Sequence, residues 1–340
     1  MFIDNNTENE RLKKGMGSHM TAEDKKMLDR INEYANRVLK SNDSKNARVS
    51  YQLDKLKPVM EEIAKEQNTT VEDIFVRFMD LESQAANEII GQKKKQSPLY
   101  DFTTEDQITH RVWCIDSDSE IATIQHAFNN IEQIYIADGH HRCASAVKVG
   151  LRMREANPGY TGKEEFNYFL SVLFADEELM IMDYNRVVKD LNGLTNEEFV
   201  NRISSVYTIL QQDSKCHRPS HKGQIAMYLD HTWYLLELKD GFGSTHPVDG
   251  LDVAILQNQI LAPVLNIQDP KTDKRIDFVG GIRGMEELER RVHTDSAVAF
   301  AMYPTSIHEL FEVADAGLLM PPKSTWFEPK LRSGLFIHAI

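Results

Sequence analysis

Positions 137–142, with the sequence ADGHHR, gather an aspartate, two histidines and an arginine around one glycine. The stretch follows an apolar run and precedes a segment of small residues that is typical of a helix start. The first amides of a helix have no partner within it, and the helix dipole adds partial positive charge, so an anion binds well there. Gly139 permits a positive φ and a close approach of ligand to backbone. Arg142 can bind two phosphate oxygens at once.

The side chains around Gly139 suit phosphate chemistry. His140 and His141 can donate a hydrogen bond or a proton, and Asp138 can orient a histidine, hold Mg²⁺ or accept a hydroxyl proton. We therefore predict catalytic roles for Asp138, His140 and His141, and phosphate binding by Gly139, His140, His141 and Arg142. The alternative is an ordinary Asp-Gly turn in which Asp138 caps the helix and Arg142 lies at the surface. Adjacent histidines are expected to diverge, which disfavours a zinc ion held by both.

A second group of candidates lies near the C-terminal end, in MPPKSTWFEPK at 320–330. Lys323, Ser324 and Lys330 suit a phosphate or carboxylate, and three prolines reduce the entropy lost when this segment orders around a ligand. The alternative is a structural strap whose aromatic residues fill the core. Asn185 and Arg186, at the end of an apolar strand, are secondary candidates for the same cleft, or simply hydrogen-bonded strand residues.

Several of these stretches together resemble a known family. IYIADGHHR at 134–142, DYNR at 183–186, LD at 251–252, DFVGG at 277–281 and MPPKSTWFEPK at 320–330 look like motifs of the DUF1015 family, and the resemblance spans residues 98–340. In its DGHHR turn this family is similar to the ParB/sulfiredoxin-like superfamily, which includes nucleotide-dependent free serine kinases. The resemblance implies that the turn binds nucleotide phosphates while a separate glutamate activates the serine hydroxyl. Sulfiredoxins place a catalytic cysteine where this chain has His140, so sulfiredoxin chemistry is not expected.

The N-terminal part departs from the family pattern. Family members carry a His-Glu pair followed by Lys and Asp-Arg; His19, Lys26, Asp29 and Arg30 match that spacing, but Met20 stands in place of the glutamate. Residues 17–20, GSHM, read either as an expression-tag scar or as natural sequence. Because the general base of the family is missing, a catalytically impaired regulatory protein is an open alternative.

Composition narrows the class of protein. The net charge of −13 over 340 residues disfavours a nucleic-acid partner bound through a basic surface. Three cysteines without a CxxC spacing argue against a disulfide framework or a structural zinc site. We find no membrane-spanning run and no signal peptide, and we expect a cytoplasmic protein without membrane contact.

Hydrophobic periodicity predicts an α+β protein with a helical N-terminal region and a mixed C-terminal domain. The family resemblance implies that the α/β core between them is ParB/sulfiredoxin-like. The predicted divisions are 1–97, 98–163 and 164–340. Predicted helices cover 22–39, 53–65, a segment from Thr70 to Leu81, 121–128, 143–154, 197–206, 251–265, 285–292 and 306–316. Predicted strands cover 110–115, 134–137, 167–174, 179–188, 225–229, 233–238, 276–279 and 297–302. A further helical turn ends at Gly91, and a solvated linker follows at 92–98. Thr70 with Asp73 and Thr195 with Glu198 are expected to cap the helices that follow them. The strands at 225–229 and 233–238 are expected to form a hairpin around Asp230 and His231.

These observations predict a phosphotransferase that uses ATP or ADP, with Mg²⁺, on a small hydroxyl metabolite, serine or phosphoserine first. The alternative is a regulatory protein that binds a nucleotide or phosphometabolite without turnover. A ParB-like DNA partner is disfavoured by the acidic balance. The sequence leaves the oligomeric state open.

Overall fold

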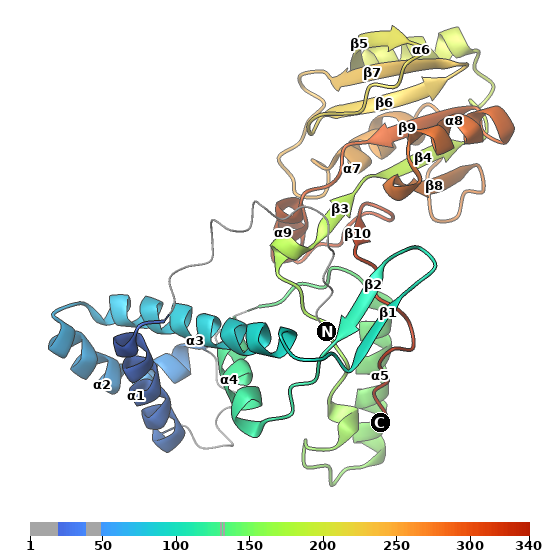
Figure 1. Ribbon diagram of the computed structural model, residues 1–340. Helices are drawn as coiled ribbons and strands as arrows, with labels where there is room; N and C mark the ends of the chain where they lie inside the picture. The colour runs from blue at the N-terminus through green and yellow to red at the C-terminus, as the bar shows by residue number, and fades with distance from the viewer. Residues whose placement is uncertain (1–19, 39–48, 130, 132) are drawn as a thin grey trace. The chain divides into compact units, whose positions relative to one another are not determined.

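The computed structural model describes residues 20–38, 49–129, 131 and 133–340, and the chain divides into two compact units, Met1–Ile134 and Tyr135–Ile340. Helices combine with antiparallel sheets, which confirms the predicted α+β class (Figure 1). The boundaries predicted at 97/98 and 163/164, and the ParB/sulfiredoxin-like core, stay predictions. His19 and residues 17–18 lie outside the described residues. No helix in the described part is long and apolar enough to cross a bilayer.

The first unit is built on three helices, α1 (Ala22–Val38), α2 (Val49–Gln67) and α3 (Val71–Lys94). Apolar side chains at helical spacing form their shared core, including Ile31, Met60 and Phe78. Thr70 and Asp73 make the reciprocal bonds of a capping box, as predicted. The predicted break at Gly91 is wrong, because α3 runs through it to Lys94; a helical glycine costs only about 1 kcal/mol.

The same unit continues with a small hairpin and a fourth helix. Strand β1 (Tyr100–Thr103) pairs with β2 (Thr109–Val112) in antiparallel register, and α4 (Asp118–Asn129) covers the helix predicted at 121–128. The predicted strand at 110–115 ends at Val112. Strand β1 was not predicted, because its alternation of aromatic and polar side chains covers only four residues and all four are exposed.

The second unit contains a six-stranded antiparallel sheet in the order β5-β7-β6-β9-β4-β8 (Figure 1). Its strands are β4 (Tyr184–Val188), β5 (Tyr207–Asp213), β6 (Gln224–Leu229), β7 (Thr232–Leu238), β8 (Ile276–Gly280) and β9 (Val298–Met302). Alternate residues of the central strands enter two cores. Met227 and Phe300 face the core that includes α6 (Asn196–Val206) and α7 (Asp252–Leu256), whereas Ala226 and Ala299 face α8 (Met285–Thr294).

Several local predictions for this unit are confirmed. Thr195 and Glu198 form the capping box of α6, and the β6–β7 hairpin turns at Asp230 and His231, which both have positive φ. Helix α9 (Ile307–Asp315) follows a Ser306 cap. The predicted helix at 251–265 is instead α7 followed by a π-helix, Gln257–Leu261. The strand predicted at 179–188 divides into β3 (Met180–Met182) and β4, and β3 pairs with β10 (Trp326–Glu328).

Two predicted strands are wrong. Residues 134–137 and 168–174 have irregular structure, and single 3₁₀ turns at Glu165–Asn167 and Asp176–Glu178 flank the second of these segments. No described strand lies beside them, so their backbone groups gain no ladder partner and side chains such as Ile136 and Leu170 stay exposed. Helix α5 (His140–Ala156) begins three residues before the predicted start and packs its Gly150 against the backbone of Phe166.

Candidate phosphate-binding site

The site begins at the left-handed residue that starts α5. Gly139 is the N-cap with φ +80° and ψ 20°, and no side chain caps this helix. The Asp138 carboxylate accepts the Gly139 N–H at 2.7 Å, so it bonds the residue before the helix and leaves the first helical turn open. His140, His141 and Arg142 form that turn. The N-terminal amides of a 17-residue helix therefore face outward without a side-chain acceptor.

Arg142 folds back over Gly139. A Cβ built on Gly139 would lie 2.8 Å from Arg142 Nη2 and 3.1 Å from its Nε. The positive φ favours glycine, and a Cβ at this position would displace the Arg142 guanidinium. The consequence is a guanidinium placed at the positive end of the helix dipole, where an anion would find charge and N–H donors together.

The two histidines lie together rather than apart. Their ring centroids are 4.1 Å apart with a 48° tilt, and both side chains are exposed. The expected divergence is wrong, because rotation about the side-chain torsions brings the rings into contact although adjacent Cα–Cβ bonds point apart. Paired rings offer two donors near the same helix start.

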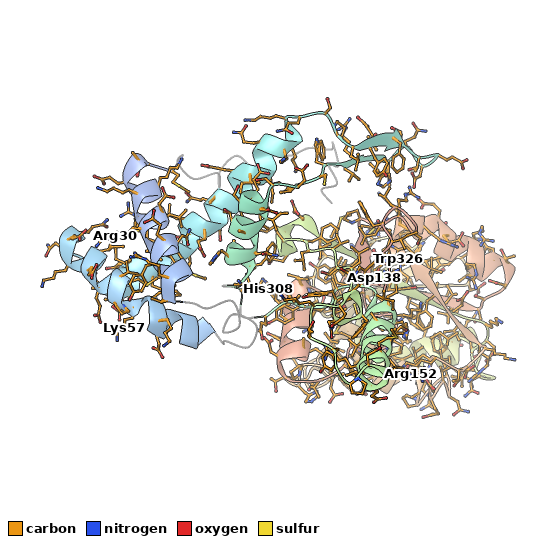
Figure 2. All side chains as sticks on the ribbon, turned by 90° about the horizontal axis from the view of Figure 1, so that it is seen from below. Arg30, Lys57, Asp138, Arg152, His308 and Trp326 are labelled. Atoms are coloured by element: carbon orange, nitrogen blue, oxygen red, sulfur yellow. The ribbon has the colours of Figure 1, made fainter. Side chains whose placement is uncertain are left out.

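Lys330 is, after Arg142, a second cation near the start of α5. Its Nζ donates to the Asp138 carboxylate at 3.0 Å and lies 5.2 Å from the centroid of the Trp326 ring. The Lys330 amide donates to Glu328, whose carboxylate also accepts the Trp326 indole N–H at 2.8 Å. Thus the C-terminal stretch contacts ADGHHR, as its composition suggested; Figure 2 labels Asp138 and Trp326.

The Asp138 carboxyl stays ionised in this setting. Partial burial acts to raise its pKa, but the hydrogen bonds from Lys330 and the Gly139 amide, with the charges of Lys330 and Arg142, hold that pKa below its usual value. A proton acceptor at this position therefore works only after Lys330 moves to another partner.

Lys323 and Ser324 lie in another part of the C-terminal segment. Ser324 is buried; its hydroxyl donates to the Pro321 carbonyl at 2.6 Å, and its carbonyl accepts from Thr305 at 3.2 Å. Lys323 has a positive φ, and its Nζ lies 5.5 Å from the centroid of the Tyr184 ring. These contacts serve the fold of the segment, and none joins either residue to ADGHHR.

Asn185 and Arg186 are buried in β4. Asn185 accepts the Met302 amide at 2.9 Å and donates to the Asp183 carboxylate. Arg186 donates to the carbonyls of Tyr184 and Lys323, the latter at 3.1 Å. Asn185 thus ties β4 to β9 and Arg186 ties β4 to the C-terminal segment, and these contacts are separate from those of Asp138 and Lys330.

Trp326 lies at the candidate site, whereas the sequence indicated only a role in the core for the aromatic residues of 320–330. It supports the Lys330 ammonium on one side and packs on Gly280, where a Cβ would lie 2.5 Å from the indole Cε3. Tyr184 meets it edge-on at 5.4 Å between ring centroids. The paired glycines at 280–281 were the available signal, since a strand interrupted by glycine often marks a close approach.

The Mg²⁺ ion expected at Asp138 stays a prediction. Both oxygens of Asp138 already accept hydrogen bonds, and no group of three or more His, Cys, Asp or Glu side chains suited to a metal occurs among the described residues. We derive no step through a metal.

The chain belongs to the DUF1015 family, described as a protein of unknown function, because the family model matches residues 54–254, more than half of the chain. This confirms the family resemblance. The match begins within α2, earlier than the expected start at residue 98. No curated protein sequence matches significantly.

Structures of a free serine kinase are among the similar folds. One mutant in complex with AMP is 14% identical with a TM-score of 0.29, and the alignment covers 56% of this chain and 66% of that one. The same mutant in complex with ADP is 12% identical with a TM-score of 0.30, and the alignment covers 72% of this chain and 80% of that one. The chain thus spans slightly less than two thirds of the first relative. Similarity this low carries no argument about activity.

Proposed function

We propose that this protein is a nucleotide-dependent phosphotransferase of the serine kinase type, acting on a small hydroxyl metabolite with ADP or ATP as phosphate donor. One observation carries the proposal: Arg142 and Lys330 both lie at the uncapped start of α5, where Gly139 leaves the backbone accessible. Two cations, free helical amides and a glycine are the groups that a polyphosphate requires.

The proposed roles follow from the contacts. Arg142 and the first amides of α5 bind phosphate oxygens, and His140 and His141 donate to them. Lys330 leaves Asp138 for the incoming phosphate, since a phosphate carries more charge than the carboxylate. The freed Asp138 can then accept the proton of a substrate hydroxyl. Catalysis would come from positioning and charge neutralisation. Phosphate binding by Lys323 and Ser324 stays a prediction, since their contacts hold the C-terminal segment and do not reach ADGHHR.

A regulator that binds nucleotide without turnover is the second candidate. Met20, at the position where the family pattern has glutamate, packs against the apolar core of α1–α3 and offers no base. Under either candidate we propose a cytoplasmic protein with small-molecule partners and no nucleic acid.

Titration calorimetry with ADP and ATP, with and without Mg²⁺, tests the proposal on the wild type and Arg142→Ala. We expect wild-type binding and a loss of at least about tenfold in the variant. Phosphorus NMR with serine or phosphoserine then separates the two candidates: transfer identifies the enzyme, and binding alone identifies the regulator. Equal binding by both proteins would remove the phosphate site from ADGHHR.

A further inference from the structure

Arg186 is a buried cation with no carboxylate partner. Its side chain is on a residue only 3% exposed, and its hydrogen bonds run to two backbone carbonyls, those of Tyr184 and Lys323. The guanidinium also lies 5.6 Å from the centroid of the Phe278 ring. In the part of the chain that the structure describes, no ion pair forms at Arg186. A guanidinium has five N–H donors, so these carbonyls leave donors unused.

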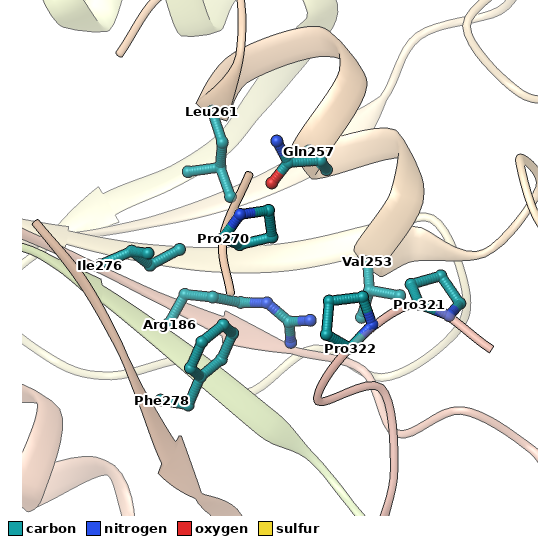
Figure 3. A pocket seen from close by; sticks show the side chains of 9 residues that line it. All are labelled: Arg186, Val253, Gln257, Leu261, Pro270, Ile276, Phe278, Pro321 and Pro322. Carbon is teal, nitrogen blue, oxygen red and sulfur yellow. The ribbon is translucent and has the colours of Figure 1, made fainter. Parts of the chain in front are cut away.

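A small cavity adjoins this charge. It has a volume of about 40 Å³, and its walls include Arg186, Val253, Gln257, Phe278 and Pro322. In Figure 3 the Arg186 side chain extends toward Pro322 beside Phe278, and the amide of Gln257 lies across the same space. Since about 10–15 Å³ suffices for one water, the cavity has room for about three waters or an anion of a few heavy atoms.

Gln257 adds an unused acceptor to the same cavity. Its amide nitrogen donates to the Ile267 carbonyl at 2.7 Å, while its Oε1 is buried and has no hydrogen-bond partner among the described residues. Gln257 is also the first residue of the π-helix that follows α7. Single π-turns are frequent at functional sites because they reorient side chains. The cavity therefore presents a cation on one wall and an acceptor on another.

The charge persists at neutral pH. Burial lowers the pKa of Arg186 to about 9, against a small opposing effect of Tyr184, so the guanidinium stays protonated below that value. An isolated buried charge is costly, and a bound anion of opposite charge offsets much of that cost.

We propose that this cavity binds a short 2-hydroxycarboxylate, with the carboxylate against Arg186 and the hydroxyl donating to Gln257 Oε1. One negative charge neutralises the guanidinium, and the hydroxyl satisfies the orphaned acceptor. An amino acid fits less well, because its ammonium would be buried beside a guanidinium of the same charge. The site shares no contact with ADGHHR and does not depend on the nucleotide proposal.

The test is calorimetric titration of the full chain with glycolate, acetate and glycine, without nucleotide, at constant ionic strength in a bulky sulfonate buffer. We expect glycolate to bind at least about tenfold more tightly than acetate, and glycine more weakly than both. Gln257→Glu supplies an internal carboxylate to Arg186 and should abolish glycolate binding. Gln257→Leu loses the same bond to Ile267 but keeps the cationic wall, so it should bind acetate and lose the preference for glycolate.

Three results would overturn the proposal: no saturable glycolate binding by the wild type, equal affinity for glycolate and acetate, or unchanged glycolate binding in Gln257→Glu. Circular dichroism of both variants establishes that they are folded. If Gln257→Glu does not fold, the acetate and glycolate affinities of Gln257→Leu are the remaining test of the variants. Loss of the preference for glycolate supports the proposal, and an unchanged preference overturns it.

Discussion

Lys330 Nζ donates to the Asp138 carboxylate at 3.0 Å, across 192 positions of the chain. The pair joins the C-terminal segment to the helix start that we propose as the phosphate site. Both side chains are about half exposed, so the ion pair adds little to the stability of the fold. Its proposed importance is that it keeps the Lys330 ammonium next to the phosphate site. A lysine that is paired with a carboxylate next to an anion site can exchange that carboxylate for the phosphate of a bound ligand at a small cost in free energy.

Replacing Lys330 by Met should weaken nucleotide binding with little loss of stability. One phosphate contact and one positive charge disappear, so we expect ADP affinity to fall about tenfold, which corresponds to about 1.4 kcal/mol. Calorimetry measures the affinity and thermal unfolding the stability. Lys271→Met is the matched control and should bind as the wild type does, since Lys271 is exposed and its ammonium group bonds to none of the described residues. Equal affinities in the two variants would exclude Lys330 from the site.

Gly139→Ala should impair both stability and binding, and Gly162→Ala only stability. The two glycines have φ of +80° and +88°, so alanine is strained at each by about 1–2 kcal/mol. Only at Gly139 would the new Cβ displace Arg142, since nothing lies within 4 Å of a Cβ at Gly162. Comparable loss of melting temperature, with ADP affinity reduced in Gly139→Ala alone, is the expected pattern. Comparable affinities would mean that Arg142 does not bind the nucleotide.

Local signals allowed much of the fold to be predicted from the sequence. The capping boxes at Thr70 and Thr195 and the hairpin at Asp230 and His231 each depend on a few adjacent residues, and all are confirmed. The strand predicted at residues 134–137 does not form, because an apolar, β-branched run folds as a strand only if another strand lies beside it.

The candidate site was predictable in part. Its first half is one contiguous hexapeptide whose residue types indicate phosphate chemistry. The role of Trp326 and the partnership of Lys330 with Asp138 depend on chain segments far apart in sequence, and no local pattern reports such a contact. Arg186 was predicted either to reach the cleft or to be a hydrogen-bonded strand residue. Its burial without a carboxylate partner among the described residues follows only from the packing of β4 against the C-terminal segment.

Asp252 should make stability depend on pH in an unusual direction. Burial raises its pKa to about 6; the Gly223 amide bonds oppose this and the Glu309 charge adds to it. The folded state then holds a proton more tightly than the unfolded state, whose carboxyl has a pKa of about 4. Between those values the contribution of Asp252 to stability is present at low pH and is lost as the pH rises through 6.

Asp252→Asn removes this titration. We expect the free energy of unfolding of the variant, relative to the wild type, to rise by about 2–3 kcal/mol between pH 4 and pH 7 and then level off. Urea unfolding at several pH values measures it. Asp240→Asn, at an exposed aspartate, should show no such trend. A relative stability independent of pH would mean that Asp252 titrates as an ordinary carboxyl.

Gly280→Ala should destabilise the C-terminal segment through Trp326. The added Cβ would lie 2.5 Å from indole Cε3, so the ring must move, and overpacking of this kind costs about 1–3 kcal/mol. Since the ring also supports the Lys330 ammonium at 5.2 Å from its centroid, ADP affinity should fall with it.

A double-mutant cycle separates the effect of the Trp326 ring on stability from other causes. In a Trp326→Leu background the smaller side chain leaves space for the methyl group, and Gly280→Ala should then cost little. The same cost in both backgrounds would place the strain in the backbone of β8 and remove Trp326 from the explanation.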